Sequence, residues 1–131
     1  MPTHRFTHSV LLVDHPVSAD STRLAFGLHG ICTHVCPWPD DAIQLALATG
    51  ADVLVIDPAV RRGCVDGFAL ARAVRAHRRL CRAWLIALGA SPTRDAERIA
   101  LAAGFDHYWT KPADPERLAQ LVREVRVPIL H

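Results

Sequence analysis

Apolar runs alternate with amphipathic segments along almost the whole chain. The runs at 9–13, 53–56 and 83–88 are nearly unbroken and rich in Val, Ile and Leu, which is typical of strands buried on both faces of a parallel sheet. The runs at 31–36 and 105–110 mix apolar and polar residues, and the first of these is expected at a sheet edge. Between and after the strands, the pattern predicts helices at 18–29, 40–49, 68–78, 92–103 and 114–125.

Capping residues indicate where these helices begin and end. Gly30, Gly50 and Gly104 each follow a predicted helix, as expected of C-terminal caps. Ser91 is the predicted N-cap of the helix that begins at Pro92. Helical spacing predicts that the first helix buries Ala19, Leu24, Ala25 and Leu28, and that the fourth buries Ala96, Ile99, Ala100 and Ala103.

Five strands alternating with five helices, joined by short connections, indicate an α/β fold. This order requires right-handed crossovers and a parallel sheet sandwiched between two layers of helices. The sequence shows no internal repeat and no linker. We therefore expect a single domain over residues 1–131, with a core at about 9–125 and flexible tails.

The composition narrows the setting in which the protein works. Half of the 131 residues are hydrophobic and 21% are charged, which is typical of a globular domain. The N-terminal residues lack the apolar segment of a secretory signal, and no apolar run reaches the roughly 18 residues of a membrane helix. The four cysteines are therefore expected as free thiols in the cytoplasm, without a membrane partner.

The basic residues are unevenly distributed. Seven of the 15 Lys and Arg residues lie between Arg61 and Arg82, whereas Lys111 is the only lysine. No aromatic residues interleave with the arginine cluster, and the formal net charge is only +2. A solvated helix face is therefore favoured over a nucleic-acid interface.

Charged residues follow three of the predicted strands. Asp14 comes after 9–13, Asp57 after 53–56 and Lys111 after 105–110. In open α/β sheets the ligand site lies outside the carboxyl ends of the strands. An aspartate nucleophile beside an ammonium group suits phosphoryl transfer, because the ammonium stabilises the phosphoryl oxygens. The structural alternative for Asp57 is a solvated carboxylate at a strand–loop junction.

Short motifs around these residues carry a resemblance to a known family. They are VLLVD ending at Asp14, VLVID ending at Asp57, the pair at 66–67, LIALGA at 85–90, GFDHY at 104–108 and TKP at 110–112. In this order and spacing, from about 9 to 125, the chain resembles the response-regulator receiver domains. The resemblance implies a flavodoxin-like, doubly wound (βα)5 fold, in which three layers enclose a five-stranded parallel sheet of order 2-1-3-4-5.

The resemblance also implies roles for single residues. In such domains the aspartate after the third strand accepts a phosphoryl group from a histidine kinase or phosphotransfer protein, and this role falls on Asp57. Lys111 would contact the phosphoryl group, and Asp14 with Asp57 would help to bind Mg²⁺ or Mn²⁺. Tyr108 corresponds to the switch aromatic of the family, and Gly89 corresponds to its switch Ser or Thr.

The implied activity is signalling in a two-component phosphorelay. The domain is not expected to be an enzyme beyond self-catalysed phosphoryl transfer and dephosphorylation. A downstream protein is expected on the face built from the helix at 92–103, the strand at 105–110 and the helix at 114–125. Trp109 belongs either to this patch or to the core. A homodimer is left open.

Two substitutions change the expected pocket. His15 replaces the second acid that the family carries after its first strand. Imidazole suits Mn²⁺ or Zn²⁺ better than Mg²⁺, so His15 is the weakest of the expected metal ligands and metal binding should be weakened. The alternative is that its ring hydrogen-bonds Asp14 or Asp57. Gly89 lacks the usual hydroxyl, so its coupling to Tyr108 is expected to be broken at one end.

The loop after the nucleophile also differs from the family. Asp57 and Gly67 lie ten positions apart, about two more than the family usually has. Pro58 removes a backbone N–H donor directly after Asp57. Arg61 stands in place of the usual proline and is either a source of charge for a phosphate or solvated surface.

Two functions of different classes follow. The first is a receiver that is phosphorylated on Asp57, which the retained Lys111 favours. The second is a pseudo-receiver, an interaction module that works without phosphate, which His15 and Gly89 favour. Treatment with a small phosphodonor and a divalent cation would separate them.

Overall fold

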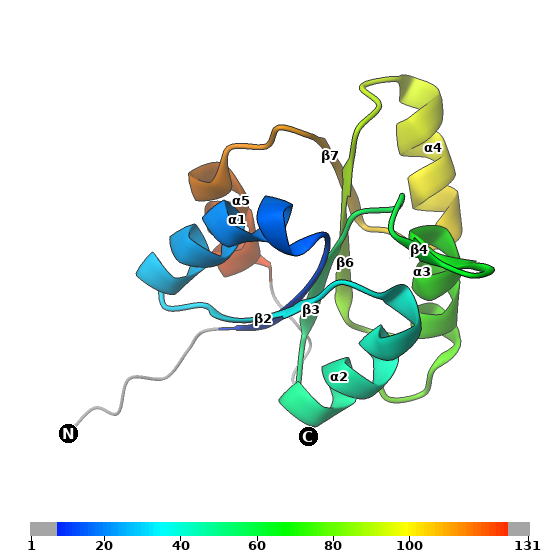
Figure 1. The fold of residues 1–131 in the computed structure, drawn as a ribbon, viewed down its shortest axis with the longest axis horizontal. Helices are drawn as coiled ribbons and strands as arrows, with labels where there is room; N and C mark the ends of the chain where they lie inside the picture. The colour runs from blue at the N-terminus through cyan, green and yellow to red at the C-terminus, as the bar shows by residue number, and fades with distance from the viewer. Residues whose placement is uncertain (1–7, 126–131) are drawn as a thin grey trace.

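The computed structural model describes residues 8–125, and the expected tails lie outside this range. Five parallel strands form one sheet in the order β2-β1-β3-β6-β7, which confirms the predicted order (Figure 1). The strands are β1 (Ser9–Val13), β2 (Cys32–Cys36), β3 (Val53–Ile56), β6 (Trp84–Gly89) and β7 (His107–Thr110). The predicted edge strand at 31–36 is the edge strand β2.

Helices cover both faces of the sheet, as Figure 1 shows. On one face lie α1 (Pro16–Leu28) and α5 (Pro115–Glu124). On the other lie α2 (Ala42–Thr49), α3 (Gly67–Ala76) and α4 (Arg94–Ala103). This three-layer arrangement follows from the short βα connections, which place a helix between successive parallel strands.

The strands bury side chains on both faces, so the core has two halves. Leu11 and Leu54 pack with the side chains of α2, α3 and α4, whereas Val10 and Val53 pack with those of α1 and α5. All four residues of β3 are fully buried. The unbroken apolar run at 53–56 reflects this two-sided burial.

Several element ends differ from the prediction because of local capping. α1 begins at Pro16, because the side chain of His15 caps it. The segment at 40–49 opens with a 3-10 turn, η1 (Pro39–Asp41). α4 begins at Arg94, because Thr93 and not Ser91 accepts the capping hydrogen bond. The loop at 61–66 contains a small antiparallel hairpin, β4 (Arg61–Arg62) and β5 (Val65–Asp66).

The predicted helical stripes are partly wrong. In α1, Leu24 and Leu28 are 68% and 83% exposed, while Phe26 is fully buried. The large ring of Phe26 faces the sheet and sets the orientation of the helix. In α4, Ile99 is 54% exposed, although Ala100 and Ala103 are buried as predicted.

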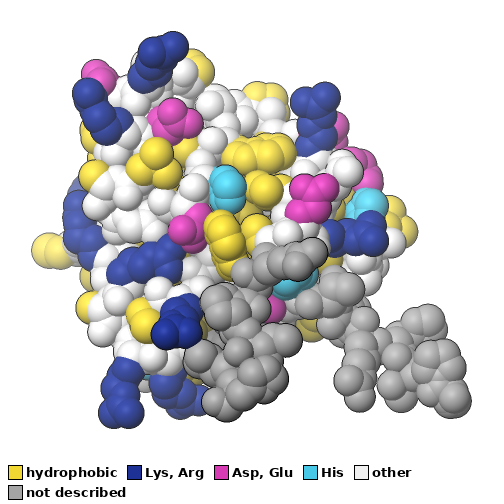
Figure 2. Space-filling model, turned by 180° about the vertical axis from the view of Figure 1, so that it is seen from behind, with side chains coloured by type: hydrophobic (Ala, Val, Ile, Leu, Met, Phe, Trp, Pro, Cys, Tyr) yellow, Lys and Arg dark blue, Asp and Glu magenta, His cyan; other side chains and the backbone are white. Residues whose placement is uncertain are grey.

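Arg75 has a structural role that the expected solvated arginine face did not include. Its guanidinium donates to the carbonyl oxygens of Gly104, Cys81 and Ala83 at 2.8, 3.0 and 2.6 Å, and to the carboxylate of Asp106 at 2.7 Å. Figure 2 shows dark blue side chains along the side of the molecule formed by α3 and α4, with magenta side chains among them. Within residues 8–125, no helix is long and apolar enough to cross a membrane.

Candidate functional site

The structure brings together three residues that are far apart in the sequence. The Lys111 Nζ lies 2.8 Å from Oδ2 of Asp57 and 2.9 and 3.0 Å from the two carboxylate oxygens of Asp14. The Asp14 side chain is 3% exposed, whereas those of Asp57 and Lys111 are 19% and 26% exposed. The cluster therefore lies at the floor of a cleft in which Asp14 is buried while solvent partly reaches both Asp57 and Lys111.

The sheet itself positions these side chains. Each residue lies one position beyond the end of its strand, where its backbone N–H still donates to a neighbouring strand. The N–H of Asp57 donates to Val13, and that of Lys111 donates to Gly89. The carboxyl ends of β1, β3 and β7 consequently present their charges at the same edge of the sheet.

The contacts with the two carboxylates control the titration of Lys111. Burial alone would lower the pKa of its ammonium group, because burial disfavours charge. The hydrogen bonds and negative charges of Asp57 and Asp14 outweigh burial and raise the pKa above its ordinary value. The side chain is therefore a fixed positive charge at neutral pH.

The Asp57 carboxylate divides its two oxygens between different partners. Oδ2 accepts from Lys111, and Oδ1 accepts from the backbone N–H of Ala59 at 2.8 Å. Pro58 has no N–H to offer. Behind this loop, a Cβ on Gly67 would lie 2.5 Å from Cα of Pro58 and 2.8 Å from the carbonyl oxygen of Asp57. The start of α3 therefore supports the loop after Asp57 by direct backbone contact.

His15 lines the cleft, but its ring caps the N-terminus of α1. Its Nδ1 accepts a hydrogen bond from the N–H of Val17 at 3.3 Å and caps α1. Its backbone N–H, not its ring, donates to Oδ1 of Asp14 at 2.7 Å. The contact with Asp14 that the sequence suggested for the ring is therefore made by the main chain.

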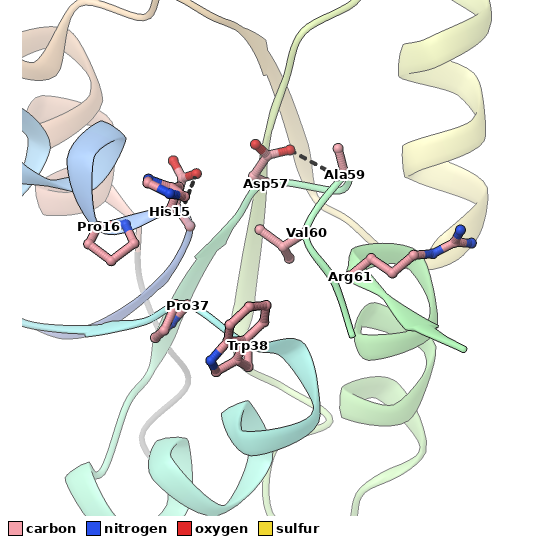
Figure 3. Close-up of a pocket in the computed structure, with 9 residues that line it drawn as sticks. His15, Pro16, Pro37, Trp38, Asp57, Ala59, Val60 and Arg61 are labelled. Carbon is pink, nitrogen blue, oxygen red and sulfur yellow. Dashed lines mark hydrogen bonds between the residues drawn. The ribbon is translucent and has the colours of Figure 1, made fainter. Parts of the chain in front are cut away.

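A cavity of about 470 Å³ opens beside Asp57 and is shown in Figure 3. Its walls are largely apolar, formed by Pro16, Pro37, Trp38 and Val60. Its other lining residues are Asp14, His15, Asp57, Ala59 and Arg61. The side chain of Arg61 points away from Asp57 in Figure 3. Arg61 therefore occupies the solvated surface position and not a position beside a phosphate on Asp57.

Trp38, which lines this cavity, was not predicted from the sequence as a site residue, whereas Arg62 was considered with Arg61 as either a source of charge for a phosphate or solvated surface. The Arg62 guanidinium lies over the Trp38 ring, 4.8 Å from its centroid, and within 3.7 and 3.4 Å of the carboxylates of Asp40 and Asp41. These contacts link the β4–β5 hairpin to η1. The sequence did contain a clue to the position of Trp38, because this residue closely follows the end of β2 and so lies at the same edge of the sheet as Asp57.

Gly89 and Tyr108 meet at the end of β6, on the side of Asp57 that faces α4. A Cβ on Gly89 would lie 2.7 Å from both Cε2 and Cζ of Tyr108, and closer still to its hydroxyl oxygen. The Tyr108 hydroxyl donates to the carbonyl oxygen of Ser91. The ring therefore fills the space that a side chain at position 89 would need. Trp109 points to the opposite face and packs against the core beside α1 and α5.

The cleft has some, but not all, of the ligands of a typical divalent-cation site. Within residues 8–125, no three His, Cys, Asp or Glu side chains are grouped as a metal site. Asp14 and Asp57 nevertheless place two carboxylates on one cleft. Mg²⁺ is commonly held by one or two carboxylates, with water and phosphate oxygens completing its shell. The two carboxylates fit that pattern, and His15 is not required for it.

Comparison with known proteins gives relatives of the whole domain. No protein-family model matches the chain. An uncharacterized 14.6 kDa protein in the sodA1 3′ region of Leptolyngbya boryana is 33% identical over 116 residues, which are 88% of this chain and 87% of that protein. The Francisella response regulator 1452 receiver domain is 26% identical with a TM-score of 0.76, covering 89% of this chain and 97% of that one.

A further solved structure is similar in fold. The receiver domain of the sensor histidine kinase PA1611 from Pseudomonas aeruginosa PAO1 has a TM-score of 0.77 and 24% identity, covering 88% of this chain and 94% of that one. That structure contains a magnesium ion coordinated in its active site cleft.

Fold, site and relatives agree on the class of protein. A five-stranded parallel sheet in this order, with two carboxylates and a lysine at its carboxyl edge, is the flavodoxin-like architecture of receiver domains. The chain is similar to the response-regulator receiver domains of two-component signalling, with 26% identity to the Francisella domain. The predicted family and fold class are thus confirmed.

Proposed function

We propose that Asp57 accepts a phosphoryl group from a phosphohistidine of a histidine kinase or phosphotransfer protein. The observation that carries this proposal is the contact of Lys111 with Oδ2 of Asp57 at 2.8 Å, in a cleft that solvent reaches. The ammonium group pairs with the carboxylate and offers its charge to an incoming phosphoryl group. The same contact disfavours the phosphate-independent module, because such a module has no need of a charged nucleophile.

The proposed transfer is a displacement at phosphorus. A carboxylate oxygen of Asp57 forms the new P–O bond, the P–N bond of the donor breaks, and its electron pair returns to the imidazole, which takes up a proton. Lys111 stabilises the charge on the phosphoryl oxygens. Reaction of the mixed anhydride with water later releases inorganic phosphate and restores the carboxylate. Both steps are self-catalysed in this proposal.

A divalent cation completes the proposed site. Asp14 and Asp57 are the residues that would hold Mg²⁺ or Mn²⁺, which supplies positive charge to the phosphoryl oxygens when bound. Lys111 already shares both carboxylates, and a third acidic ligand is lacking at position 15. We therefore expect weak binding.

The setting of this reaction is also proposed. We expect a single domain over residues 1–131 that works in the cytoplasm, which the four free cysteines favour. A downstream protein would dock on α4, β7 and α5, where Ile99 and Leu101 of α4 are exposed apolar side chains. A homodimer could use the same face. Nucleic acid is not an expected partner.

Incubation with acetyl phosphate and Mg²⁺ or Mn²⁺, followed by intact mass measurement, tests the proposal. The wild-type protein should gain the mass of one phosphoryl group, and Asp57→Asn should not. Asp95→Asn is the matched control, because Asp95 is an exposed aspartate on α4, and it should gain the mass normally. Equal mass gain in wild type and Asp57→Asn, or no gain in either, would overturn the proposal.

A further inference from the structure

The missing hydroxyl at position 89 has a structural replacement in this protein. The Tyr108 ring lies so close to Gly89 that any Cβ there would overlap it, and its hydroxyl oxygen is the atom nearest to the position of that Cβ. β6 and β7 are adjacent parallel strands, with Ala87 opposite Tyr108 and Gly89 opposite Thr110. The tyrosine thus reaches diagonally across to the end of β6 and brings its own hydroxyl there.

The same hydroxyl borders a cavity that reaches Asp57. This cavity, of about 240 Å³, is lined by Asp57, Gly89, Ser91 and Tyr108 together with five further residues. Among its lining side chains, only those of Ser91 and Tyr108 carry a hydroxyl. Lys111 and Asp14 border a different cavity, of about 320 Å³, on the side of α1 and α5. The α4 side of Asp57 therefore has no cation of its own in its lining.

A phosphoryl group on Asp57 would need hydrogen-bond donors on that side. In an aspartyl phosphate, a group with about 1.5–2 negative charges and three acceptor oxygens replaces the single charge of the carboxylate. Lys111 donates to Oδ2 of Asp57, away from α4, and the N–H of Ala59 already donates to Oδ1. Pro58 has no N–H, and Gly89 has no side chain. Of the two lining side chains that carry a hydroxyl, Ser91 pairs with the Thr93 hydroxyl at 3.1 Å, whereas the Tyr108 hydroxyl lies where a Cβ on Gly89 would be.

We propose that the Tyr108 hydroxyl donates a hydrogen bond to the phosphoryl group on Asp57, and that Gly89 is the residue that gives it access. The proposal rests on the proposed phosphorylation of Asp57. In the unphosphorylated protein the proton points to the carbonyl oxygen of Ser91. Rotation about the Cζ–Oη bond redirects the proton to a phosphoryl oxygen, so no proton is transferred and no covalent bond changes.

The lifetime of the phosphorylated form tests this inference. Wild type and Tyr108→Phe are phosphorylated with acetyl phosphate, desalted and followed by intact mass. Tyr108→Phe keeps the ring and removes only the hydroxyl. Its aspartyl phosphate should decay about tenfold faster, or accumulate about tenfold less, because a hydrogen bond to a charged group is lost. Gly89→Ala should give a similar loss, since its Cβ displaces the ring.

A double variant distinguishes the hydroxyl from packing. In Gly89→Ser/Tyr108→Ala the ring is removed and a hydroxyl is supplied from β6, so the lifetime should return toward that of wild type. Melting temperatures of all variants establish that each is folded. Gly27→Ala is the control, because a Cβ there meets nothing within 4 Å, and it should behave as wild type.

The outcomes separate the two proposals. If wild type gains no phosphoryl mass, the phosphorylation of Asp57 and this inference fall together. If wild type is phosphorylated and Tyr108→Phe has the same lifetime, only this inference is overturned. A double variant that decays as fast as Tyr108→Phe would show that a hydroxyl supplied at this place does not restore the lifetime, and would also overturn the inference.

Discussion

Lys111 shows how much of the site depends on one side chain. Its ammonium group contacts both carboxylates of the cleft, one of them almost fully buried. Without it, the two carboxylates of Asp14 and Asp57 would share the cleft with no cation between them. The lone lysine therefore stabilises the pocket, and under the proposed function it would also stabilise the phosphoryl oxygens.

The raised pKa of Lys111 predicts a stability loss at high pH. The ordinary lysine pKa is 10.5, and the folded protein has a higher value, because Asp57 and Asp14 outweigh the effect of burial. The stabilisation is therefore complete below about pH 10.5 and is lost as the pH rises through the folded pKa. Urea unfolding of wild type should show this loss, whereas Lys111→Met should lack it. Parallel pH profiles for the two proteins would contradict the prediction.

The four thiols should differ in reactivity according to their burial. Burial raises the pKa of the Cys36 thiol, against the lowering effect of a hydrogen bond with the backbone of Trp38. Cys64 and Cys81 are exposed. At neutral pH iodoacetamide should modify Cys64 and Cys81 well before Cys36, because the thiolate is the reactive form. Peptide mass mapping over time checks the order, and early modification of Cys36 in folded protein would refute it.

At the scale of secondary structure, the sequence predicts the strands better than the ends of the helices. Two-sided burial leaves a strong signature, as in the apolar run that ends before Asp57. Helix ends depend on single capping contacts, such as those of His15 and Thr93, which several neighbouring residues could have made. The β4–β5 hairpin has only two residues in each strand, too few for any periodicity to appear.

The part of the candidate site that lies directly after the strands could be predicted from the sequence. The sequence places Asp14, Asp57 and Lys111 at the carboxyl edge, and their meeting follows from the sheet order of the family. The Gly89–Tyr108 overlap was not predictable, because it depends on a diagonal contact between neighbouring strands. The same holds for the closeness of Gly67 to the loop after Asp57, which arises from packing of a helix start and not from a local motif.

Gly67 should be intolerant of a side chain. Alanine at this position would place its Cβ 2.5 Å from Cα of Pro58 and 2.8 Å from the carbonyl oxygen of Asp57, and backbone atoms cannot move aside as a flexible side chain can. We expect Gly67→Ala to lower the free energy of unfolding by about 1–3 kcal/mol. Its matched control is Gly27→Ala in α1, where a Cβ meets nothing, and which should raise stability by about 0.5–1 kcal/mol. Chemical denaturation measures both, and equal effects of the two substitutions would contradict the explanation.

At the scale of the whole molecule, the sheet joins the two halves of the core. On the side of α3 and α4, Arg75 also ties α3 to the loops that precede β6 and β7. This side chain extends from α3 to the loop before β6 and to the loop before β7. It is half-buried and its donors are used within the protein. The arginine-rich side of the molecule is therefore less free for a nucleic-acid partner than its charge suggests.

Arg75→Met should destabilise the entire domain. Three carbonyl oxygens and the Asp106 carboxylate would lose the guanidinium as their donor. The Asp106 carboxylate would still accept a hydrogen bond from the N–H of Leu85. Hydrogen bonds of charged groups contribute more than neutral ones, so a loss of about 2–4 kcal/mol is expected. Arg72→Met, an exposed arginine one turn earlier in α3, should change stability by less than about 0.5 kcal/mol. Thermal and urea unfolding give both values. If the two variants were equally stable, Arg75 would be only one more solvated arginine, and the loops before β6 and β7 would be held by the sheet alone.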